Sequence, residues 1–137
     1  MDLTPTDIAL IRKSIERLTD PRTGRDPFGR EFYGALFEEA PETKALFRED
    51  LSEQGMRFLS TLRLIAEALD APETLSDHMT RLAEGHRAYG VRPEHYAPMG
   101  RALRRALKQA LGERYDGETD AAWDRAYQAM SQKMQAV

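Results

Sequence analysis

The chain contains three histidines, and their spacing limits the metal chemistry they could do. His78 and His86 are eight residues apart, so on one helix they point about 80° away from each other. This separation is poor geometry for a shared metal ion. His95 follows Gly90 and Pro93, beside the predicted start of another helix. We interpret His78 and His95 as surface or interface residues.

His86 differs from the other two because it lies one turn after Leu82 on the inner face of its predicted helix. The residue pattern favours a core histidine with satisfied hydrogen bonds, and it leaves a second role open. A neutral imidazole can donate from one ring nitrogen to the carbonyl of Leu82. The other nitrogen is then free to bind iron.

A group of aromatic residues is the second candidate for chemistry. Phe32 and Tyr33 are adjacent. Phe37 lies on the next turn, and Phe47 ends a short predicted helix. Core packing explains the phenylalanines, whereas a buried tyrosine hydroxyl needs a polar partner. The amide of Gln54, which both donates and accepts hydrogen bonds, is a candidate for that partner.

The composition argues against several other kinds of site. Without cysteine, the chain offers no disulfide, thiolate metal ligand, cysteine nucleophile or iron–sulfur cluster. No HExxH motif, glycine-rich phosphate loop or EF-hand spacing occurs. No apolar run approaches the roughly 20 residues of a membrane span, and the first residues lack a signal-peptide pattern. We therefore expect a cytoplasmic protein with no membrane partner.

The charge balance argues against nucleic-acid binding. The 137 residues carry 20 basic and 23 acidic side chains with the two signs interspersed, for a net charge of −3. Two basic clusters, Arg22 to Arg30 and Arg101 to Lys108, lie among acids or on the polar face of a helix. Solvated side chains explain both clusters, so we expect no nucleic-acid partner.

Helical periodicity runs through the sequence, and no alternating run is long enough to predict a strand. The first helix has the clearest start: Thr4 can cap it, Pro5 suits its first turn, and Asp7 stands where a capping-box acid belongs. Apolar side chains at helical spacing mark the inner faces of several helices: Ile8, Ile11, Ile15 and Leu18; Phe58, Leu62, Ile65 and Leu69; Met79 and Leu82; Tyr96, Met99, Leu103 and Leu107; and Ala126, Tyr127, Met130 and Met134.

Proline, glycine and capping residues predict where helices begin and end. The segment from Asp20 to Arg30, with two prolines and two glycines, is predicted to be a loop. Ser76 is expected to cap a helix that Gly90 ends, and Pro93 to open the next helix. Thr119 is expected to cap the last one. The sequence therefore predicts an all-α protein of about six or seven helices in one domain.

Five segments follow one another along the chain: PETKALF, EQGMRFLSTLRLI, RLAEGHRAYGVRPEHYAPMGRAL, LGE and AAWDRAYQAM. Together they resemble the bacterial single-domain globins and the globin domain of flavohaemoglobins. The likeness runs from about Phe32 to Met134. It implies a globin fold, with about six to seven helices around a haem pocket, formed by residues 1–137 as a single globin domain.

The resemblance implies haem b, iron protoporphyrin IX, as the cofactor. His86 corresponds to the proximal histidine that ligates the haem iron. Tyr33 and Gln54 correspond to the distal pair that hydrogen-bonds to a gas ligand. The other matched positions surround the porphyrin: Phe47 against its face, Phe58 above the iron, Arg57 where a cation meets a haem propionate, and Leu82, Val91, Tyr96 and Met99 in the proximal pocket.

The implied function is reversible binding of O₂, with CO and NO as further ligands. One alternative is an NO dioxygenase, in which Tyr33 and Gln54 would be catalytic and a separate reductase would restore ferrous iron. Another is a gas or redox sensor module, with or without haem. In flavohaemoglobins the proximal histidine and the tyrosine matched by Tyr96 pair with a late glutamate. This sequence ends at Val137 before that glutamate and without a reductase domain, which favours the binding protein.

Overall fold

The computed structural model describes residues 3–20, 26–47 and 51–137, and all regular structure within these ranges is helical. The helices in chain order are α1 (Pro5–Thr19), α2 (Asp26–Glu39), η1 (Pro41–Leu46), α3 (Leu51–Glu67), α4 (Pro72–Ala88), η2 (Pro93–His95), α5 (Tyr96–Leu111), η3 (Gly112–Arg114) and α6 (Gly117–Gln135), where η marks a 3₁₀-helix. The predicted all-α fold is confirmed. None of the helices in these ranges is long and apolar enough to cross a lipid bilayer.

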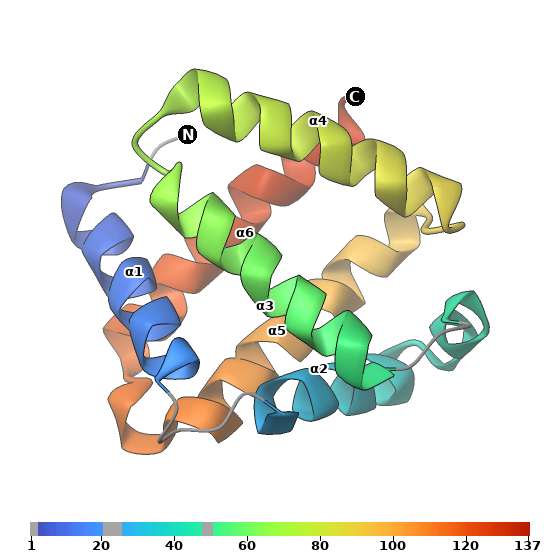
Figure 1. Ribbon diagram of the computed structural model, residues 1–137, viewed down its shortest axis with the longest axis horizontal. Helices are drawn as coiled ribbons and strands as arrows, with labels where there is room; N and C mark the ends of the chain where they lie inside the picture. Colours follow the sequence, from blue (N-terminus) through green and yellow to red (C-terminus); the bar gives the residue numbers. More distant parts are fainter. Residues whose placement is uncertain (1–2, 21–25, 48–50) are drawn as a thin grey trace.

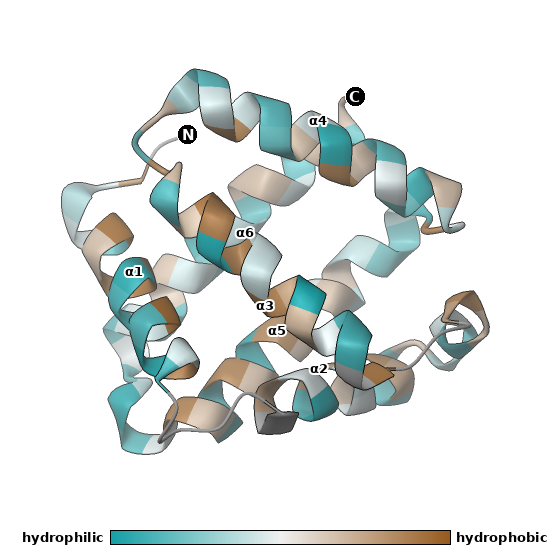
Figure 2. Ribbon diagram, in the orientation of Figure 1, coloured by the Kyte–Doolittle hydropathy of each residue, from teal (hydrophilic) through white to brown (hydrophobic). Residues whose placement is uncertain are grey.

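The α-helices pack around a shared core in which α3 crosses in front of α5, while α2 and α4 lie at opposite sides of the molecule (Figure 1). Helix α2 packs against α3 and α5, and α1 packs against α3 and α6. Each labelled helix carries both hydrophobic and hydrophilic residues, as amphipathic helices around a core do (Figure 2). Trp123 and Phe28 are the largest of the fully buried side chains.

The start of α1 confirms the predicted capping box and also joins two distant parts of the chain. Thr4 Oγ1 accepts from the backbone N–H of Asp7 at 3.0 Å, and Asp7 Oδ2 accepts from the backbone N–H of Thr4 at 3.2 Å. The buried carboxylate of Asp7 also accepts two hydrogen bonds from Arg125 of α6, at 2.6 and 3.1 Å. Arg125 therefore lowers the pKa of Asp7 and holds α1 against α6.

The predicted loop from Asp20 to Arg30 is wrong in its second half. Helix α2 begins at Asp26, and residues 21–25, with part of the first basic cluster, lie outside the described residues. Pro27 is the second residue of the helix, a position that proline tolerates because an N–H in the first turn has no partner within the helix. The proline therefore marks the start of a helix and not a break.

Two predicted capping residues are also wrong. Helix α4 begins at Pro72, so Ser76 lies inside it, and the residue before Pro72 makes no side-chain cap. The cap of α6 is Asp116, whose carboxylate accepts from the backbone N–H of Thr119 at 2.9 Å. Asp116, three residues before Thr119, was available to cap the helix, and its ionised carboxylate is a stronger acceptor than a hydroxyl.

A contact between two glycines sets the packing of α2 on α3. A β-carbon built on Gly29 would lie 3.1 Å from Cα of Gly55, and one built on Gly55 would lie 3.2 Å from Cα of Gly29. Both distances are shorter than an ordinary van der Waals contact. The backbones of α2 and α3 can therefore meet there only because neither residue has a side chain. Tyr33 lies one turn after Gly29, and Gln54 directly precedes Gly55.

This contact predicts that Gly29→Val will destabilise the fold by about 1–3 kcal/mol, since the added methyl groups must push α3 away. Urea unfolding followed by circular dichroism measures the loss. Gly34→Val on the same helix is the matched control, because nothing lies within 4 Å of a β-carbon at Gly34. Equal unfolding free energies for the two variants would contradict the proposed packing constraint.

Candidate functional site

A cavity of about 680 Å³ lies among the helices and is lined mostly by apolar side chains. Small-molecule sites in proteins have volumes of about 300–1,000 Å³, so this cavity is large enough for a bound cofactor. The structure places all ten residues singled out from the sequence on its walls: Tyr33, Phe47, Gln54, Arg57, Phe58, Leu82, His86, Val91, Tyr96 and Met99. They come from α2, α3, α4, α5 and the segments next to η1 and η2.

His86 lies in the last turn of α4, with its side chain on the cavity wall. Its Nδ1 donates to the carbonyl oxygen of Leu82 across 2.8 Å, as the helical spacing predicts. A carbonyl only accepts, so this bond assigns the proton to Nδ1 when the ring is neutral. Burial lowers the pKa of His86, which favours that neutral form. Nε2 has no hydrogen-bond partner among the described residues and is available to bind a metal.

A tyrosine from α6 fixes the wall beside His86. The ring of Tyr96 stacks on His86, with centroids 6.2 Å apart and planes 21° apart. The Tyr127 hydroxyl donates to the backbone carbonyl of Tyr96 at 2.5 Å. A β-carbon on Gly100 would lie 2.6 Å from Cε2 of Tyr127, so the tyrosine ring lies directly on that glycine. The absence of a side chain at Gly100 thus allows α6 to hold the first turn of α5 against His86.

Tyr33 supplies a polar group to the cavity from the opposite side of the molecule, on α2. Tyr33 is 4% exposed. The rings of Phe32 and Phe47 contact its ring edge-on, with ring centroids 5.0 and 5.1 Å away. Burial raises the pKa of Tyr33 to about 12, so the hydroxyl keeps its proton. That hydroxyl has no hydrogen-bond partner in the described part of the chain. Because Tyr33 lines the cavity, this hydroxyl can donate to a molecule bound there.

The expected partner of Tyr33, Gln54, makes a different contact. Gln54 Oε1 accepts from Nη2 of Arg57 at 2.9 Å, one turn along α3. Gln54 and Tyr33 nevertheless line the same cavity, and a β-carbon on Gly55, the residue after Gln54, would lie 3.9 Å from Cε2 of the tyrosine ring. The two polar side chains therefore belong to one cavity wall without a hydrogen bond between them among the described residues.

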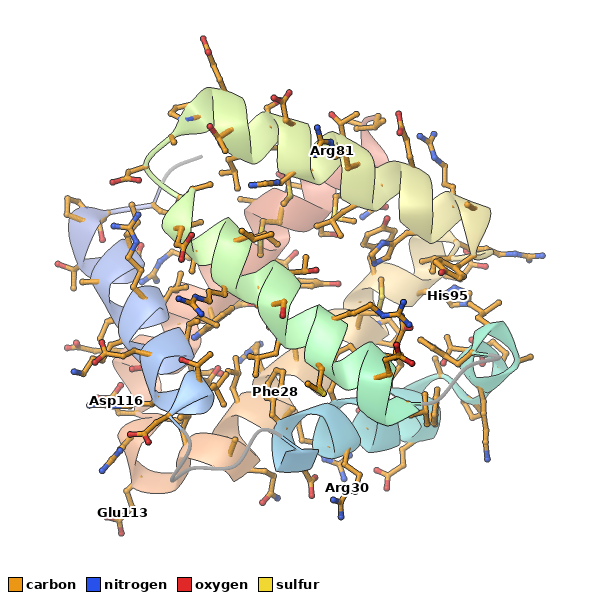
Figure 3. The ribbon with its side chains drawn as sticks, in the orientation of Figure 1. Phe28, Arg30, Arg81, His95, Glu113 and Asp116 are labelled. Carbon is orange, nitrogen blue, oxygen red and sulfur yellow. The ribbon has the colours of Figure 1, made fainter. Side chains whose placement is uncertain are left out.

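Phe58 closes the cavity between these polar groups and the core. Its ring packs on Phe32 with centroids 4.4 Å apart and on the fully buried Phe28 with centroids 5.8 Å apart. Phe28 lies between α2 and α3 in the interior (Figure 3). This continuous aromatic packing excludes water from the wall next to Tyr33.

The prediction of a surface or interface position is wrong for His95. The residue is 6% exposed, and its Nδ1 accepts from the backbone N–H of Arg92 at 3.0 Å. Its Nε2 lies 3.7 Å from Oε1 of Glu42, so His95 joins the start of α5 to η1 (Figure 3). The short 3₁₀ turn that Pro93 opens turns the side chain inward. His78 is half-buried on α4.

Several cavity residues were not identified as site residues from the sequence. These include Thr61, Ile65, Met79, Arg81, Tyr127, Met130, Ser131 and Met134. Helical spacing placed Ile65, Met79 and Met130 on inner faces, but an inward position does not distinguish a core contact from a cavity wall. Arg81 is an exposed residue of α4 that still borders the cavity, and no pattern in the sequence indicated this (Figure 3).

The sequence matches one known family over most of its length. The family model for Globin covers residues 30–134. Among curated proteins, the flavohemoprotein of Rhizobium meliloti is 31% identical over 84% of this chain, and that of Xylella fastidiosa is 31% identical over 90%. The matched region is 30% and 31% of those two proteins, so the chain spans less than a third of their length.

Solved structures agree with this family. An engineered carbene transferase and candidate nitric oxide dioxygenase from Rhodothermus marinus is 27% identical, with a TM-score of 0.83 over 98% of this chain and 92% of that one. A bacterial globin from Campylobacter jejuni is also 27% identical, with a TM-score of 0.77 over 94% and 91%. A hexacoordinated heme protein from a tardigrade, at 19% identity and a TM-score of 0.85 over 98% and 94%, shows the same fold.

The contact between Gly100 and Tyr127 predicts that Gly100→Ala will displace the tyrosine ring and break its hydrogen bond to Tyr96. The unfolding free energy should fall by about 1–3 kcal/mol, as expected for overpacking. Gly85→Ala is the matched control, because a β-carbon there has nothing within 4 Å. Urea unfolding compares the two variants, and a Gly100→Ala protein as stable as Gly85→Ala would contradict the packing described.

Proposed function

The chain belongs to the globin family, and on that premise we propose that its cavity binds haem through His86 and that the protein binds diatomic gases. The proposal is carried by one arrangement of side chains. A neutral imidazole reaches the cavity from α4 and a protonated phenol reaches it from α2, and among the described residues neither Nε2 of the imidazole nor the phenol hydroxyl has a hydrogen-bond partner.

The residues present fit a haem group. The cavity is apolar and large, which suits a flat hydrophobic macrocycle. His86 would hold the iron through Nε2, because its Nδ1 is fixed by the carbonyl of Leu82, a kind of contact that also orients ligating histidines in other proteins. Phe47 and Phe58 would contact the macrocycle, with Leu82, Val91, Tyr96 and Met99 on the His86 side.

When bound, haem supplies an iron atom with a coordination position open to O₂, NO or CO. The protein's own groups would control which gas stays bound. Tyr33 keeps its proton and can donate to a ligand that carries partial negative charge, and the amide of Gln54 can do the same. The surrounding phenylalanine rings exclude water, which strengthens such hydrogen bonds.

Three further features complete the proposal. Haem b is the form that the likeness to globins implies, and the absence of cysteine fits it, since thioether attachment of the macrocycle needs cysteine. The same composition fits a cytoplasmic protein. Residues 1–137 are proposed to form one globin domain, since the helices from both ends of the chain share one core.

The first test is the absorption spectrum of the purified protein in its ferric, ferrous and CO-bound forms. We expect a Soret band in each form and the loss of stable haem binding in His86→Ala. His78→Ala is the matched control, because His78 lies on the same helix and does not line the cavity. A protein without a Soret band and without haem uptake would overturn the proposed function, and so would a native spectrum in His86→Ala.

Tyr33→Phe should raise the rate at which O₂ leaves the protein by about tenfold, since a hydrogen bond to a partly charged group contributes about 1.5 kcal/mol or more. The pKa of about 12 for Tyr33 implies that the unmodified protein keeps a constant rate up to about pH 11, because the phenol remains protonated. Stopped-flow displacement of O₂ by CO measures the dissociation rate in Tyr33→Phe and the pH dependence of this rate in the unmodified protein. An unchanged rate in Tyr33→Phe would exclude donation by this hydroxyl.

The likeness to flavohemoproteins and to the candidate dioxygenase of Rhodothermus marinus supports a second candidate, an NO dioxygenase served by a separate reductase. Tyr33 and Gln54 would then be the catalytic donors. Multiple turnovers of NO in the presence of a reductase would favour the enzyme, whereas a single stoichiometric reaction would favour the gas-binding protein.

A further inference from the structure

The hydrogen bond between Arg57 and Gln54 fixes which end of the Gln54 amide faces its neighbour. A guanidinium carries five N–H donors and no acceptor, so it can only face the amide oxygen. Nη2 of Arg57 lies 2.9 Å from Oε1 of Gln54. The opposite end of the amide, Nε2 with its two hydrogens, is therefore the end left to face other groups.

This oriented amide and the hydroxyl of Tyr33 belong to residues that line the same cavity. Gly55 follows Gln54 in α3, and the ring of Tyr33 lies 3.9 Å from the position of a Gly55 β-carbon. The charge of Arg57 also reaches the tyrosine, because it lowers the pKa of Tyr33 and opposes the larger effect of burial. Arg57 thus acts on both polar side chains of this wall, although it is itself exposed.

From this geometry we infer that Arg57 is a positioning residue, which turns the Gln54 amide so that it donates into the cavity. The inference rests on the proposed function and adds a determinant of ligand choice to it. An amide turned the other way would present its oxygen to the ligand and repel partial negative charge. With Arg57 in place, Tyr33 and Gln54 are two donors, so the site favours the more polarised O₂ over CO.

This role differs from the contact with a haem propionate that the resemblance implies for Arg57. The two roles make different predictions. A residue that anchors the cofactor changes the rate of haem loss and is independent of Gln54. A residue that orients the amide changes gas binding, and its effect requires the Gln54 side chain.

The test is a double-mutant cycle of Arg57→Leu and Gln54→Leu in the haem-loaded protein. We expect each single variant to raise the O₂ dissociation rate by about two- to tenfold, the range for a net hydrogen bond. Arg57→Leu should change the rate much less when Gln54→Leu is already present. The C–O stretching frequency of the CO complex should rise with each single variant and show the same dependence.

A reversed charge gives a second readout. In Arg57→Glu the carboxylate can only accept, so it should turn the amide around and direct Oε1 into the cavity. We expect a faster O₂ dissociation than in Arg57→Leu, and a smaller difference between the two variants in the Gln54→Leu background. Arg63→Leu is the matched control on α3, because Arg63 pairs with Glu67 and does not line the cavity. It should leave both readouts unchanged.

Equal effects of Arg57→Leu with and without Gln54→Leu would overturn the inference. So would faster haem loss to apomyoglobin with unchanged O₂ dissociation, which would assign Arg57 to the cofactor's carboxylates. Failure of the proposed function is recognised separately, because the unmodified protein would then lack a Soret band or an O₂ complex.

Discussion

The close approach of α2 and α3 at Gly29 and Gly55 is the constraint on which the polar wall of the cavity depends. Tyr33 follows this contact by one turn on α2, and Gln54 and Arg57 flank it on α3. If either glycine carried a side chain, the helices would separate and the tyrosine would move away from the amide. A contact between two residues without functional groups therefore positions the groups that could do chemistry.

The opposite wall depends on a similar arrangement. The ring of Tyr127 lies on Gly100, and its hydroxyl fixes the turn of α5 that stacks Tyr96 on His86. Helix α6 is held in turn by the ion pair between Arg125 and Asp7 of α1. The ion pair between Arg125 and Asp7 thus contributes to the orientation of the histidine, although neither residue lines the cavity.

The polar groups on the two walls are satisfied to different degrees. Nδ1 of His86 and Oε1 of Gln54 have protein partners, whereas Nε2 of His86 and the hydroxyl of Tyr33 have none among the described residues. Each partner fixes the orientation of a side chain, and the group left over faces the cavity. This division is what a pre-organised ligand site requires, because the donors lose little freedom when the ligand arrives.

Short-range patterns predicted much of this structure. The helical period, the capping box at Thr4 and Asp7, and the bond from His86 to Leu82 all involve residues within four positions of each other, and the structure confirms them. The prolines were harder to interpret, because the same residue can break a helix or begin one. Pro27 and Pro72 begin helices, and the chain on both sides decides between the two outcomes.

The sequence by itself determined the all-α class and the inner faces of the helices, because these follow from local spacing, and its resemblance to globins made His86 the candidate iron ligand. Only the tertiary structure decided that the ten candidate residues line one cavity, that His95 is buried beside Glu42, and that the Tyr33 hydroxyl has no hydrogen-bond partner among the described residues. The physical reason is that these outcomes depend on how closely separate helices approach. At the two walls of the cavity, close approach is allowed by Gly29, Gly55 and Gly100, residues whose contribution is the space they leave.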